Sequence, residues 1–397
     1  MKILQFLEAA ATGAGRHVVD LIEGVLARGH EVHFLYSPVR SDQVFSADLQ
    51  RLKEHLNFHS APVPVGQYPS VSDVRVAATL RHYLRRCGPF DLLHCHSTKA
   101  GLIARVGLIG HSVKRLYTPH GFLSMDLARG RRMARLAGGL ERALASLCAG
   151  VVVVSREEYS HAVELGISAD KLRLIPNGMV PPRSGDLAEQ RSICRRDWGL
   201  GEDDVCIGFV GRFTAVKAPD VMLHSFAAFR KRSRVPSRLV MVGNGPLATS
   251  LRGLATELGV SGEVIWLGAQ DARPLMAGFD VLALTSKSEG HPLVVLEAMA
   301  RGLPIVATAV GGIADTVQFG VNGFIAPPGD AGAIADALEK LARDRMLCAR
   351  MGEASRAISR QFSADRMVER TLVFYQEIVT GVFAGTSHSL SKATASA

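Results

Sequence analysis

An alternation of short apolar segments with amphipathic ones runs through the sequence twice, and it constrains the fold more than any other feature. In the first half, the apolar runs Lys2–Leu7 and Glu31–Tyr36 flank Arg16–Arg28, whose apolar residues recur at helical spacing. The Pro- and Gly-rich segment Ile175–Gly185 interrupts this pattern, which restarts with the strand-like Val205–Phe209. Strands that alternate with helices predict a doubly wound parallel sheet, here formed twice.

This interruption predicts two domains, and the length of 397 residues agrees, since a domain commonly takes about 100–200 residues. We expect an N-terminal Rossmann-like domain at residues 1–182 and a C-terminal Rossmann-like domain at 183–364, facing each other across a cleft. A helix at 365–383 is expected to cross back to the N-terminal domain. The small polar residues at 384–397 predict a disordered tail. In such α/β folds a ligand binds beyond the carboxyl ends of the strands.

The composition excludes several classes of protein. Hydrophobic residues make up 47% and charged residues 21% of the chain, which argues against wholesale disorder. No apolar run approaches the roughly 20 residues of a membrane-spanning helix. The first residues carry Glu8 within their apolar stretch, unlike a secretory signal. The six cysteines form no CxxC pair, so we expect neither a disulfide framework nor a zinc site, and a reducing cytoplasm is the expected location.

The net charge of +9 is unevenly distributed. Residues 1–182 hold 22 Lys and Arg against 15 Asp and Glu, a net charge of +7, whereas the remainder holds 24 against 22, a net charge of +2. Such a bias suits an anionic membrane surface, a phosphorylated substrate or nucleic acid. We exclude nucleic acid as a partner because no recognised nucleic-acid-binding motif accompanies the charge.

The turn after the first apolar run holds Gly13-Ala14-Gly15, directly before a helical segment. Glycines at this place let a ligand approach the backbone, and the amino end of a helix favours an anion. A dinucleotide fingerprint needs a third glycine at position 18, which is Val18, so the pattern of a dehydrogenase is incomplete. A tight turn with no ligand is the equal alternative.

A second candidate site spans Ser286–Ala300, where two glutamates lie eight residues apart. Glu289 follows a predicted strand, and Glu297 lies within the next helix, whose amino end is near Pro292–Val294. Backbone N–H groups at that end favour an anion, so the arrangement suits a nucleotide sugar, with hydroxyls on either side of a diphosphate. A solvated surface glutamate is the alternative for each residue, but the neighbours of Glu297 are apolar, and a carboxylate among them needs a partner.

The segment from Glu289 to Glu297 resembles the paired-glutamate motif of the family-four retaining glycosyltransferases, which have the GT-B fold. The resemblance extends from Met1 to about Val382. The other segments that carry it are, in order, Gly13–His17, YTPHGF at 117–122, IPNG at 175–178, GRFTAVKAPD at 211–220, GNGP at 243–246 and WLG at 266–268. Each segment alone is a weak signal, but their joint order and spacing argue strongly against chance.

The resemblance implies roles for individual residues. Arg212 and Lys217 would hold the donor diphosphate, whose charge grows as it departs. Glu289 would contact the transferred sugar, Glu297 the ribose hydroxyls, and His120 would lie beside the reacting centre. The implied catalytic set is His120, Glu289, Arg212 and Lys217. The implied donor-binding set is Gly13, Gly15, Arg212, Lys217, Asn244, Gly268, Pro292, Leu293, Val294 and Glu297. Surface cations and a structural histidine are the alternatives for Arg212, Lys217 and His120.

The implied reaction is transfer of a sugar from a nucleotide donor, here expected to carry uridine, with retention at the anomeric carbon. In the same-face substitution that the resemblance implies, the leaving phosphate helps to deprotonate the acceptor, so we assign no side-chain nucleophile. The sequence holds no Asp-x-Asp metal motif, and the two cations with the helix end supply positive potential instead. We therefore predict a hexosyl- or N-acetylhexosaminyl-transferase that needs neither a metal nor a cofactor.

Two segments bear on the acceptor. His96–Gly101, read HSTKAG, together with YTPHGF resembles the enzymes that build capsules, O-antigens or exopolysaccharides on undecaprenyl-diphosphate carriers. His96 and Lys99 are therefore expected near a lipid-diphosphate-linked acceptor, and a solvated lysine is the alternative for Lys99. The segment Leu127–Leu147 interleaves arginines with leucines, and predicts a basic amphipathic helix. That helix lies either on an anionic membrane surface or on the sheet with a solvated arginine face.

These observations predict a cytoplasmic enzyme, peripheral on the inner face of the membrane. His291 and Pro292 depart from the residues frequent in the family, which leaves the transferred sugar open. A sugar-nucleotide epimerase and a glycosyltransferase with a soluble acceptor are the alternatives, together with a protein that binds a nucleotide sugar without transfer. An epimerase needs no acceptor, so an analysis of products separates it from a transferase.

Overall fold

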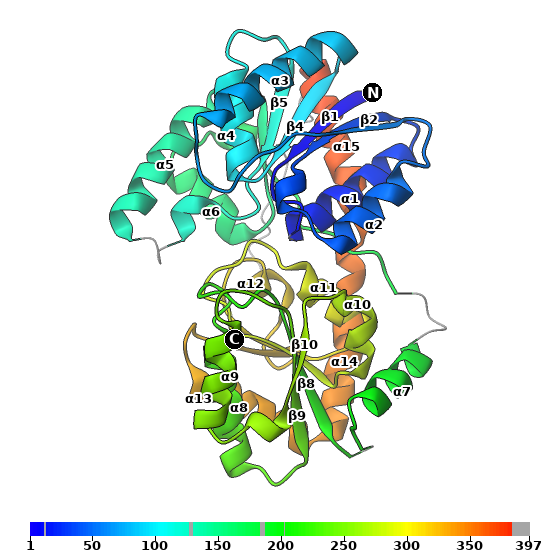
Figure 1. The fold of residues 1–397 in the computed structure, drawn as a ribbon, viewed down its shortest axis with the longest axis vertical. Coiled ribbons are helices and arrows are strands. Elements are labelled where there is room, and N and C mark those ends of the chain that lie inside the picture. The colour runs from blue at the N-terminus through cyan, green and yellow to red at the C-terminus, as the bar shows by residue number, and fades with distance from the viewer. Residues whose placement is uncertain (12, 127–129, 183–186, 202, 383–397) are drawn as a thin grey trace, which may run out of the picture.

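The chain forms two parallel β-sheets with helices packed against them, one sheet in each of two domains (Figure 1). This computed structural model describes residues 1–11, 13–126, 130–182, 187–201 and 203–382. The predicted fold, two doubly wound α/β domains, is confirmed. The predicted tail at 384–397 lies outside the described residues.

The N-terminal sheet has the strand order β3-β2-β1-β4-β5-β6-β7, and its neighbouring strands run parallel. Its strands are β1 (Lys2–Leu7), β2 (Glu31–Tyr36), β3 (Phe58–Pro62), β4 (Leu92–His96), β5 (Lys114–Thr118), β6 (Gly150–Val153) and β7 (Leu172–Leu174). Its helices are α1 (Gly13–Leu26), α2 (Gln43–Leu52), α3 (Ser72–Cys87), α4 (Thr98–Gly107), α5 (Arg131–Ala145) and α6 (Arg156–Glu164). Both faces of the central strands are buried, as expected where helices cover a parallel sheet.

The C-terminal sheet has the strand order β10-β9-β8-β11-β12-β13, also with parallel neighbours. Its strands are β8 (Val205–Val210), β9 (Ser237–Val242), β10 (Val264–Gly268), β11 (Val281–Leu284), β12 (Ile305–Thr308) and β13 (Gly323–Ala326). Its helices are α7 (Leu187–Asp197), α8 (Pro219–Arg232), α9 (Ala248–Glu257), α10 (Ala272–Leu275), α11 (Leu293–Ala300), α12 (Ile313–Thr316), α13 (Ala331–Arg343) and α14 (Arg345–Ser359). One continuous apolar core joins these elements.

The last helix, α15 (Ala364–Thr380), leaves the C-terminal domain and packs beside α1 of the N-terminal domain (Figure 1). Phe374 and Ile378 of α15 join the apolar core of that domain. The helices approach so closely at Gly24 that a Cβ there would lie 2.4 Å from a methyl of Val368. The predicted crossing of this helix back to the N-terminal domain is confirmed.

The chain passes between the domains twice, and the two crossings are hydrogen-bonded to each other. The Met179 N–H donates to the Phe362 carbonyl, and the Ala364 N–H donates to the Met179 carbonyl, both at 2.9 Å. A Cβ at Gly178 would lie 2.5 Å from the Ser363 carbonyl oxygen, so the close approach requires glycine. The predicted domain boundary at residues 182–183 falls between β7 and α7 and stays a prediction.

In each sheet the strand order reverses at one place, between β1 and β4 and between β8 and β11. The loops that follow such a pair of strands turn to opposite faces of the sheet and leave a crevice, where ligands of this fold class bind. Both reversals lie at the junction of the two domains, because the residues beyond β1 and beyond β11 meet there. The fold therefore predicts one shared site between the domains.

Candidate functional site between the domains

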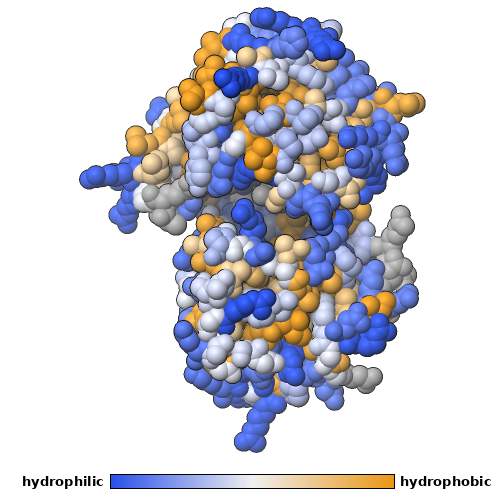
Figure 2. Space-filling model, in the orientation of Figure 1, coloured by the Kyte–Doolittle hydropathy of each residue, from blue (hydrophilic) through white to orange (hydrophobic). Residues whose placement is uncertain are grey.

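The surface is hollowed between the two domains (Figure 2). On the N-terminal side the cleft is formed by the start of α1 and the residues after β4 and β5. On the C-terminal side it is formed by the loops after β8 and β11 and by the amino end of α11. Gly290 shows how closely the walls approach, since a Cβ there would lie 3.3 Å from the His120 carbonyl carbon.

On the C-terminal wall, Lys217 and Glu289 form an ion pair in which Nζ lies 2.5 Å from Oε1. The same Glu289 oxygen accepts a hydrogen bond from Ser286 Oγ at 2.6 Å. Lys217 lies in the loop after β8 and Glu289 in the loop after β11, so two adjacent strands bring them together. Lys217 is 26% exposed and Glu289 is 9% exposed, so an anion in the cleft can reach the ammonium group.

Arg212 lies directly after β8 with an exposed side chain, and it adds a second cation to this wall. Asn244 and Gly268 tie the neighbouring loops together through their backbone. The Asn244 carbonyl accepts from the Phe213 N–H at 3.0 Å, and the Gly268 carbonyl accepts from the Gly243 N–H at 2.7 Å. These two predicted donor-site residues therefore fix the shape of the loops around β8.

The amino end of α11 faces the cleft after Pro292, and no side chain in the described part of the protein caps it. The N–H groups of Leu293 and Val294 at this end have no partner within the helix, so they are suited to an anion. Glu297 lies one turn further along and is 15% exposed. Burial raises the pKa of the Glu297 carboxyl, and the largest opposing effect comes from Arg16 of the other domain.

The two glycines of the first turn serve different purposes. A Cβ at Gly15 would lie 1.8 Å from the Ala10 carbonyl oxygen, so the turn itself requires glycine there. A Cβ at Gly13 would meet nothing within 4 Å, so its surroundings are open. The tight-turn explanation therefore accounts for Gly15, and room for a ligand exists only at Gly13.

A hydrogen-bonded chain of polar side chains lines the N-terminal wall. His120 Nε2 lies 3.1 Å from His96 Nδ1, and His96 Nε2 lies 2.8 Å from Gln5 Oε1. An amide oxygen only accepts, so the proton of His96 is on Nε2. Gln5 Nε2 donates to the Tyr375 hydroxyl at 3.0 Å. The His17 ring lies edge-on to the His120 ring, with 4.7 Å between centroids.

Burial keeps these imidazoles uncharged. It lowers the pKa of His17 to about 4 and lowers those of His96 and His120 well below the ordinary value. A neutral imidazole offers one donor and one acceptor, which suits the hydroxyls of a sugar. His120 also has a left-handed backbone, with φ of 54°, a sparsely populated conformation for a residue with a side chain.

Two groups of side chains in the described ranges have the geometry of metal ligands. Ring nitrogens of His17, His96 and His120 lie within 4.8 Å of one another, and so do ligand atoms of Glu31, His33 and His59 at the edge of the N-terminal sheet. In the first group the His96 and His120 nitrogens are already hydrogen-bonded to each other. That transfer needs no metal stays a prediction.

The structure places the two predicted acceptor residues behind the cleft surface. His96 is fully buried beneath His120. Lys99 is buried too, with its ammonium 2.9 Å from Asp73 Oδ1 and 2.5 Å from the Tyr68 carbonyl oxygen. The alternative of a solvated lysine is therefore wrong, because α4 starts inside the domain. An acceptor phosphate would have to compete with Asp73 for Lys99.

Three side chains at the cleft were missed by reasoning from sequence: Arg16, Asp20 and Glu158. Arg16 lies between Asp20 of its own helix and Glu297 of the other domain, at 3.8 Å from each. Burial raises the pKa of Asp20 to about 7. Burial also raises the pKa of Glu158 to about 7, and a Cβ at Gly290 would lie 3.1 Å from its Oε1. Glu158 follows Ser155 by three residues, a capping-box spacing that was available in the sequence.

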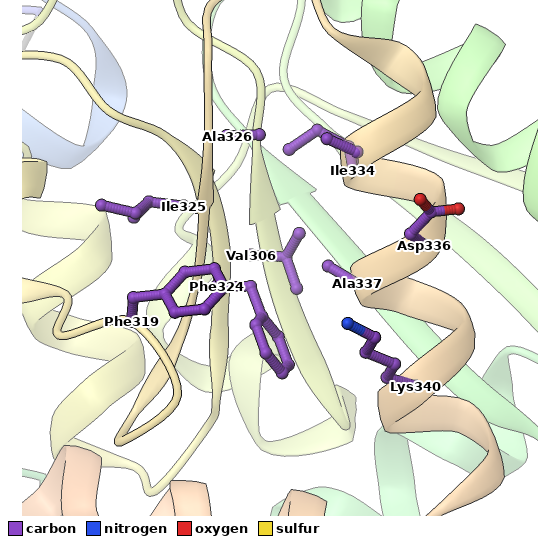
Figure 3. Close-up of a pocket in the computed structure, with 10 residues that line it drawn as sticks. Val306, Phe319, Phe324, Ile325, Ala326, Ile334, Asp336, Ala337 and Lys340 are labelled. Carbon is purple, nitrogen blue, oxygen red and sulfur yellow. The ribbon is translucent and has the colours of Figure 1, made fainter.

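A separate cavity of about 170 Å³ lies between β13 and α13, away from the cleft (Figure 3). Its lining is mostly apolar, and Lys340 Nζ lies 5.5 Å from the centre of the Phe324 ring at one side. None of the predicted site residues lines it. It offers an apolar gap at a sheet edge rather than converging polar groups.

Comparisons with known proteins agree with this architecture. Residues 11–181 match the family described as Glycosyltransferase Family 4, and residues 190–358 match Glycosyl transferases group 1. The chain is 31% identical to a D-inositol 3-phosphate glycosyltransferase of Salinispora arenicola, over 74% of this chain and 70% of that protein. It is 27% identical to an N-acetyl-alpha-D-glucosaminyl L-malate synthase of Bacillus anthracis, over 92% of this chain and 94% of that protein.

The fold is also found among solved structures. The Anabaena protein HepE, in complex with UDP and glucose, superposes with a TM-score of 0.77 at 21% identity, covering 95% of this chain and all of that one. The two facing Rossmann-like domains, the crossing helix α15 and the two family matches agree with one another. The chain belongs to the family-four, group 1 glycosyltransferases, and it has the GT-B fold.

Proposed function

We propose that this protein transfers a hexose or N-acetylhexosamine from a uridine nucleotide to a lipid-linked saccharide acceptor, with retention, in the assembly of a surface polysaccharide. The observation that carries the acceptor assignment is the outer face of α5. The donor assignment rests on the C-terminal wall of the cleft.

For the donor, the diphosphate is assigned to Arg212, Lys217 and the amino end of α11, which together gather positive charge on one wall. Glu297 is assigned to the ribose, because its carboxylate faces the cleft and is not hydrogen-bonded by any described residue. Glu289 is assigned to the transferred sugar. The uridine base is supported by HepE, a protein of the same fold that was solved with UDP.

In the proposed reaction, the bond between the anomeric carbon and the diphosphate oxygen breaks. A bond to the acceptor oxygen forms on the same face of the sugar. The acceptor hydroxyl gives its proton to the leaving diphosphate, and Lys217 and Arg212 stabilise the charge that develops there. No side-chain nucleophile is needed, and we propose that no metal is needed either.

For the acceptor, α5 carries an unusual exposed surface. Met133, Leu136 and Leu140 are 52%, 69% and 49% exposed and recur at helical spacing along one stripe. Exposed arginines flank this stripe at positions 131, 132, 135 and 142. The opposite face of α5 is anchored in the domain by Glu141, whose Oε2 lies 2.8 Å from Arg105 Nη1. An apolar stripe beside a basic one suits the surface of an anionic lipid leaflet.

No helix in the described part of the chain is long and apolar enough to span a bilayer. Attachment would therefore be peripheral, through α5 and the net charge of +7 on residues 1–182. A lipid-linked acceptor would then present its saccharide to the cleft. The relatives named for inositol 3-phosphate and L-malate make a soluble acceptor the competing assignment.

The test combines vesicle binding with a transfer assay. Vesicles with anionic lipid are loaded with undecaprenyl-diphosphate-sugar, and uridine and guanosine donors are supplied in the presence of EDTA. We expect product from a uridine donor, together with binding to anionic but not to zwitterionic vesicles. The triple change M133S/L136S/L140S should reduce vesicle binding and lipid-linked product while donor hydrolysis persists.

The matched control replaces Ile193 and Met346, exposed apolar residues of the C-terminal domain, with serine. Equal losses in both variants would contradict a role for α5. Product from malate or inositol phosphate, with none from the lipid-linked saccharide, would replace the lipid-linked acceptor by a soluble one. Epimerised donor in the absence of any acceptor would contradict the transfer itself.

A further inference from the structure

Arg16 belongs to the N-terminal domain, yet it lies against a carboxylate of the C-terminal domain. Its Nη2 lies 3.8 Å from Glu297 Oε1, and its Nε lies 3.8 Å from Asp20 Oδ1. Arg16 is 18% exposed and Glu297 is 15% exposed, so water screens this pair less than a surface pair. The contact spans the two domains at the place where the donor ribose is assigned.

The distance between the Arg16 guanidinium and the Glu297 carboxylate shows what kind of contact they make. A hydrogen bond between a guanidinium and a carboxylate spans about 2.7–2.9 Å, so 3.8 Å gives attraction between charges without a hydrogen bond. Nor does any other described side chain donate a hydrogen bond to the Glu297 carboxylate; Arg301 donates to the backbone carbonyl of Glu297 instead, at 2.9 Å. The Glu297 oxygens therefore keep their lone pairs for hydroxyl donors from a ligand.

Arg16 also favours the charged form of Glu297. Burial raises the pKa of this carboxyl, and three cations oppose it: Arg16 most, then Arg301 and Arg273, while Asp271 acts in the same direction as burial. Arg301 and Arg273 belong to the same domain as Glu297 and remain near it however the domains move. Of these three cations only Arg16 comes from the opposite wall, where Asp20 also interacts with Glu297, so the effect of Arg16 depends on how closely the walls approach.

We propose that Arg16 is a positioning residue for the donor nucleotide, which acts across the cleft by holding Glu297 charged and directed toward the ribose hydroxyls. This inference rests on the proposed function, since it assumes a nucleotide in the cleft. Two other roles for Arg16 are distinguishable. It could bind the diphosphate directly, or it could only hold the domains together.

The experiment measures dissociation constants for UDP and for 2′,3′-dideoxy-UDP, which lacks the ribose hydroxyls. The proteins are the unchanged chain, R16Q, E297Q and the double variant, with circular dichroism to verify folding. We expect R16Q to weaken UDP binding roughly tenfold, the scale of a coupling between adjacent groups. The R16Q penalty should disappear with dideoxy-UDP and in the E297Q background. R16K should restore part of the affinity for UDP.

The pH dependence of UDP binding gives a second test of the effect of Arg16 on Glu297. Arg16 opposes the effect of burial on the Glu297 carboxyl. Without Arg16, the pKa of Glu297 should therefore rise further. Because ribose binding needs the carboxylate, the acid limb of UDP binding should move to higher pH in R16Q. The variant R75Q removes the same charge from an exposed position on α3 and should leave both the affinity and the limb unchanged.

The outcomes separate the alternatives. An R16Q penalty of equal size for UDP and dideoxy-UDP would overturn the proposal in favour of direct contact with the diphosphate or a purely structural role. Additive penalties in the double variant would overturn it as well. If the unchanged chain binds no uridine nucleotide, the proposed function fails first, and this inference falls with it.

Discussion

The two walls of the cleft differ in the balance of charged and uncharged side chains. The C-terminal wall carries ionised side chains that reach the cleft, with Lys217 paired to Glu289 and Arg212 exposed. The N-terminal wall carries His17 and His120, which burial keeps uncharged, and its cation Arg16 lies toward Glu297. Exposed cations match a diphosphate, and uncharged imidazoles match hydroxyl groups without holding a counter-ion. If the proposed function holds, we expect this difference to let one cleft distinguish the two ends of a nucleotide sugar.

The largest effect is expected from removing charge on the C-terminal wall. Lys217→Ala should lower kcat/KM for transfer by about a hundredfold to a thousandfold, because it removes a cation from the leaving group and leaves Glu289 unpaired. On the N-terminal wall, His17→Asn exchanges one uncharged group for another and should lower kcat/KM for transfer by about tenfold. Steady-state kinetics with saturating acceptor would measure both.

Lys287→Ala, which removes an exposed cation from the same region, should have little effect. An equal loss of kcat/KM in His17→Asn and Lys217→Ala would contradict the difference between the walls. A loss in Lys217→Ala that appears mainly in kcat would sharpen the comparison, because the leaving group carries more charge in the transition state than in the bound donor.

A second effect concerns stability in acid. The folded chain keeps His17 neutral down to a pKa of about 4, while the unfolded chain takes up its proton near the ordinary value. The neutral form of His17 thus contributes fully to the free energy of unfolding above pH 6.5, and this contribution is lost as the pH falls toward 4. At pH 5 the loss is about 2 kcal/mol from this ring alone. His94, His96 and His120 have pKa values lowered in the same direction by burial.

Denaturant titrations at pH 5 and pH 7 would measure this loss for each domain. Both tryptophans, Trp198 and Trp266, lie in the C-terminal domain, so their fluorescence follows that domain, whereas near-ultraviolet tyrosine signals follow the N-terminal one. We expect the tyrosine transition to shift more on acidification, because the C-terminal wall contributes one such ring, His291, with a pKa of about 3. Equal shifts would contradict the contrast.

The smallest effect is expected at the far end of the histidine network. Tyr375→Phe removes the hydroxyl that lies 2.7 Å from His94 Nδ1 and accepts from Gln5 Nε2. Leaving these buried groups without a partner should lower the free energy of unfolding by about 1–3 kcal/mol. The change should affect the N-terminal transition, and Tyr36→Phe, at a half-buried position on β2, serves as the control.

The same contrast explains what the sequence could predict. The C-terminal wall comes from contiguous motifs, such as 211–220 and 289–300, whose spacing is visible in the chain. The strand rhythm likewise predicted the central strands, which are buried on both faces. The edge strands β3 and β13 are short and partly exposed, so their apolar signal is weak. The roles assigned to the predicted site residues stay predictions.

The N-terminal wall could not be predicted in the same way. Gln5, His96 and Tyr375 lie on β1, β4 and α15, and only the folded sheet with its crossing helix makes them one network. The burial of Lys99 depends on Asp73 from the start of α3, a contact with no local signal. Arg16 lies within Gly13–His17, one of the segments that carry the family resemblance, but its partner Glu297 is in the other domain.

The path of α15 bears on how the chain is made. The N-terminal domain leaves the ribosome first, yet its core includes Met367, Phe374 and Ile378 of the last helix. At about 5–20 residues per second, the roughly 200 residues between β7 and the end of α15 take about 10–40 s to synthesise. During that interval the apolar face of α1 stays uncovered, while the C-terminal sheet can close on elements contiguous in the chain. We therefore expect the nascent protein to expose apolar surface until α15 is made, and a chain ending before Phe374 to keep part of that surface exposed.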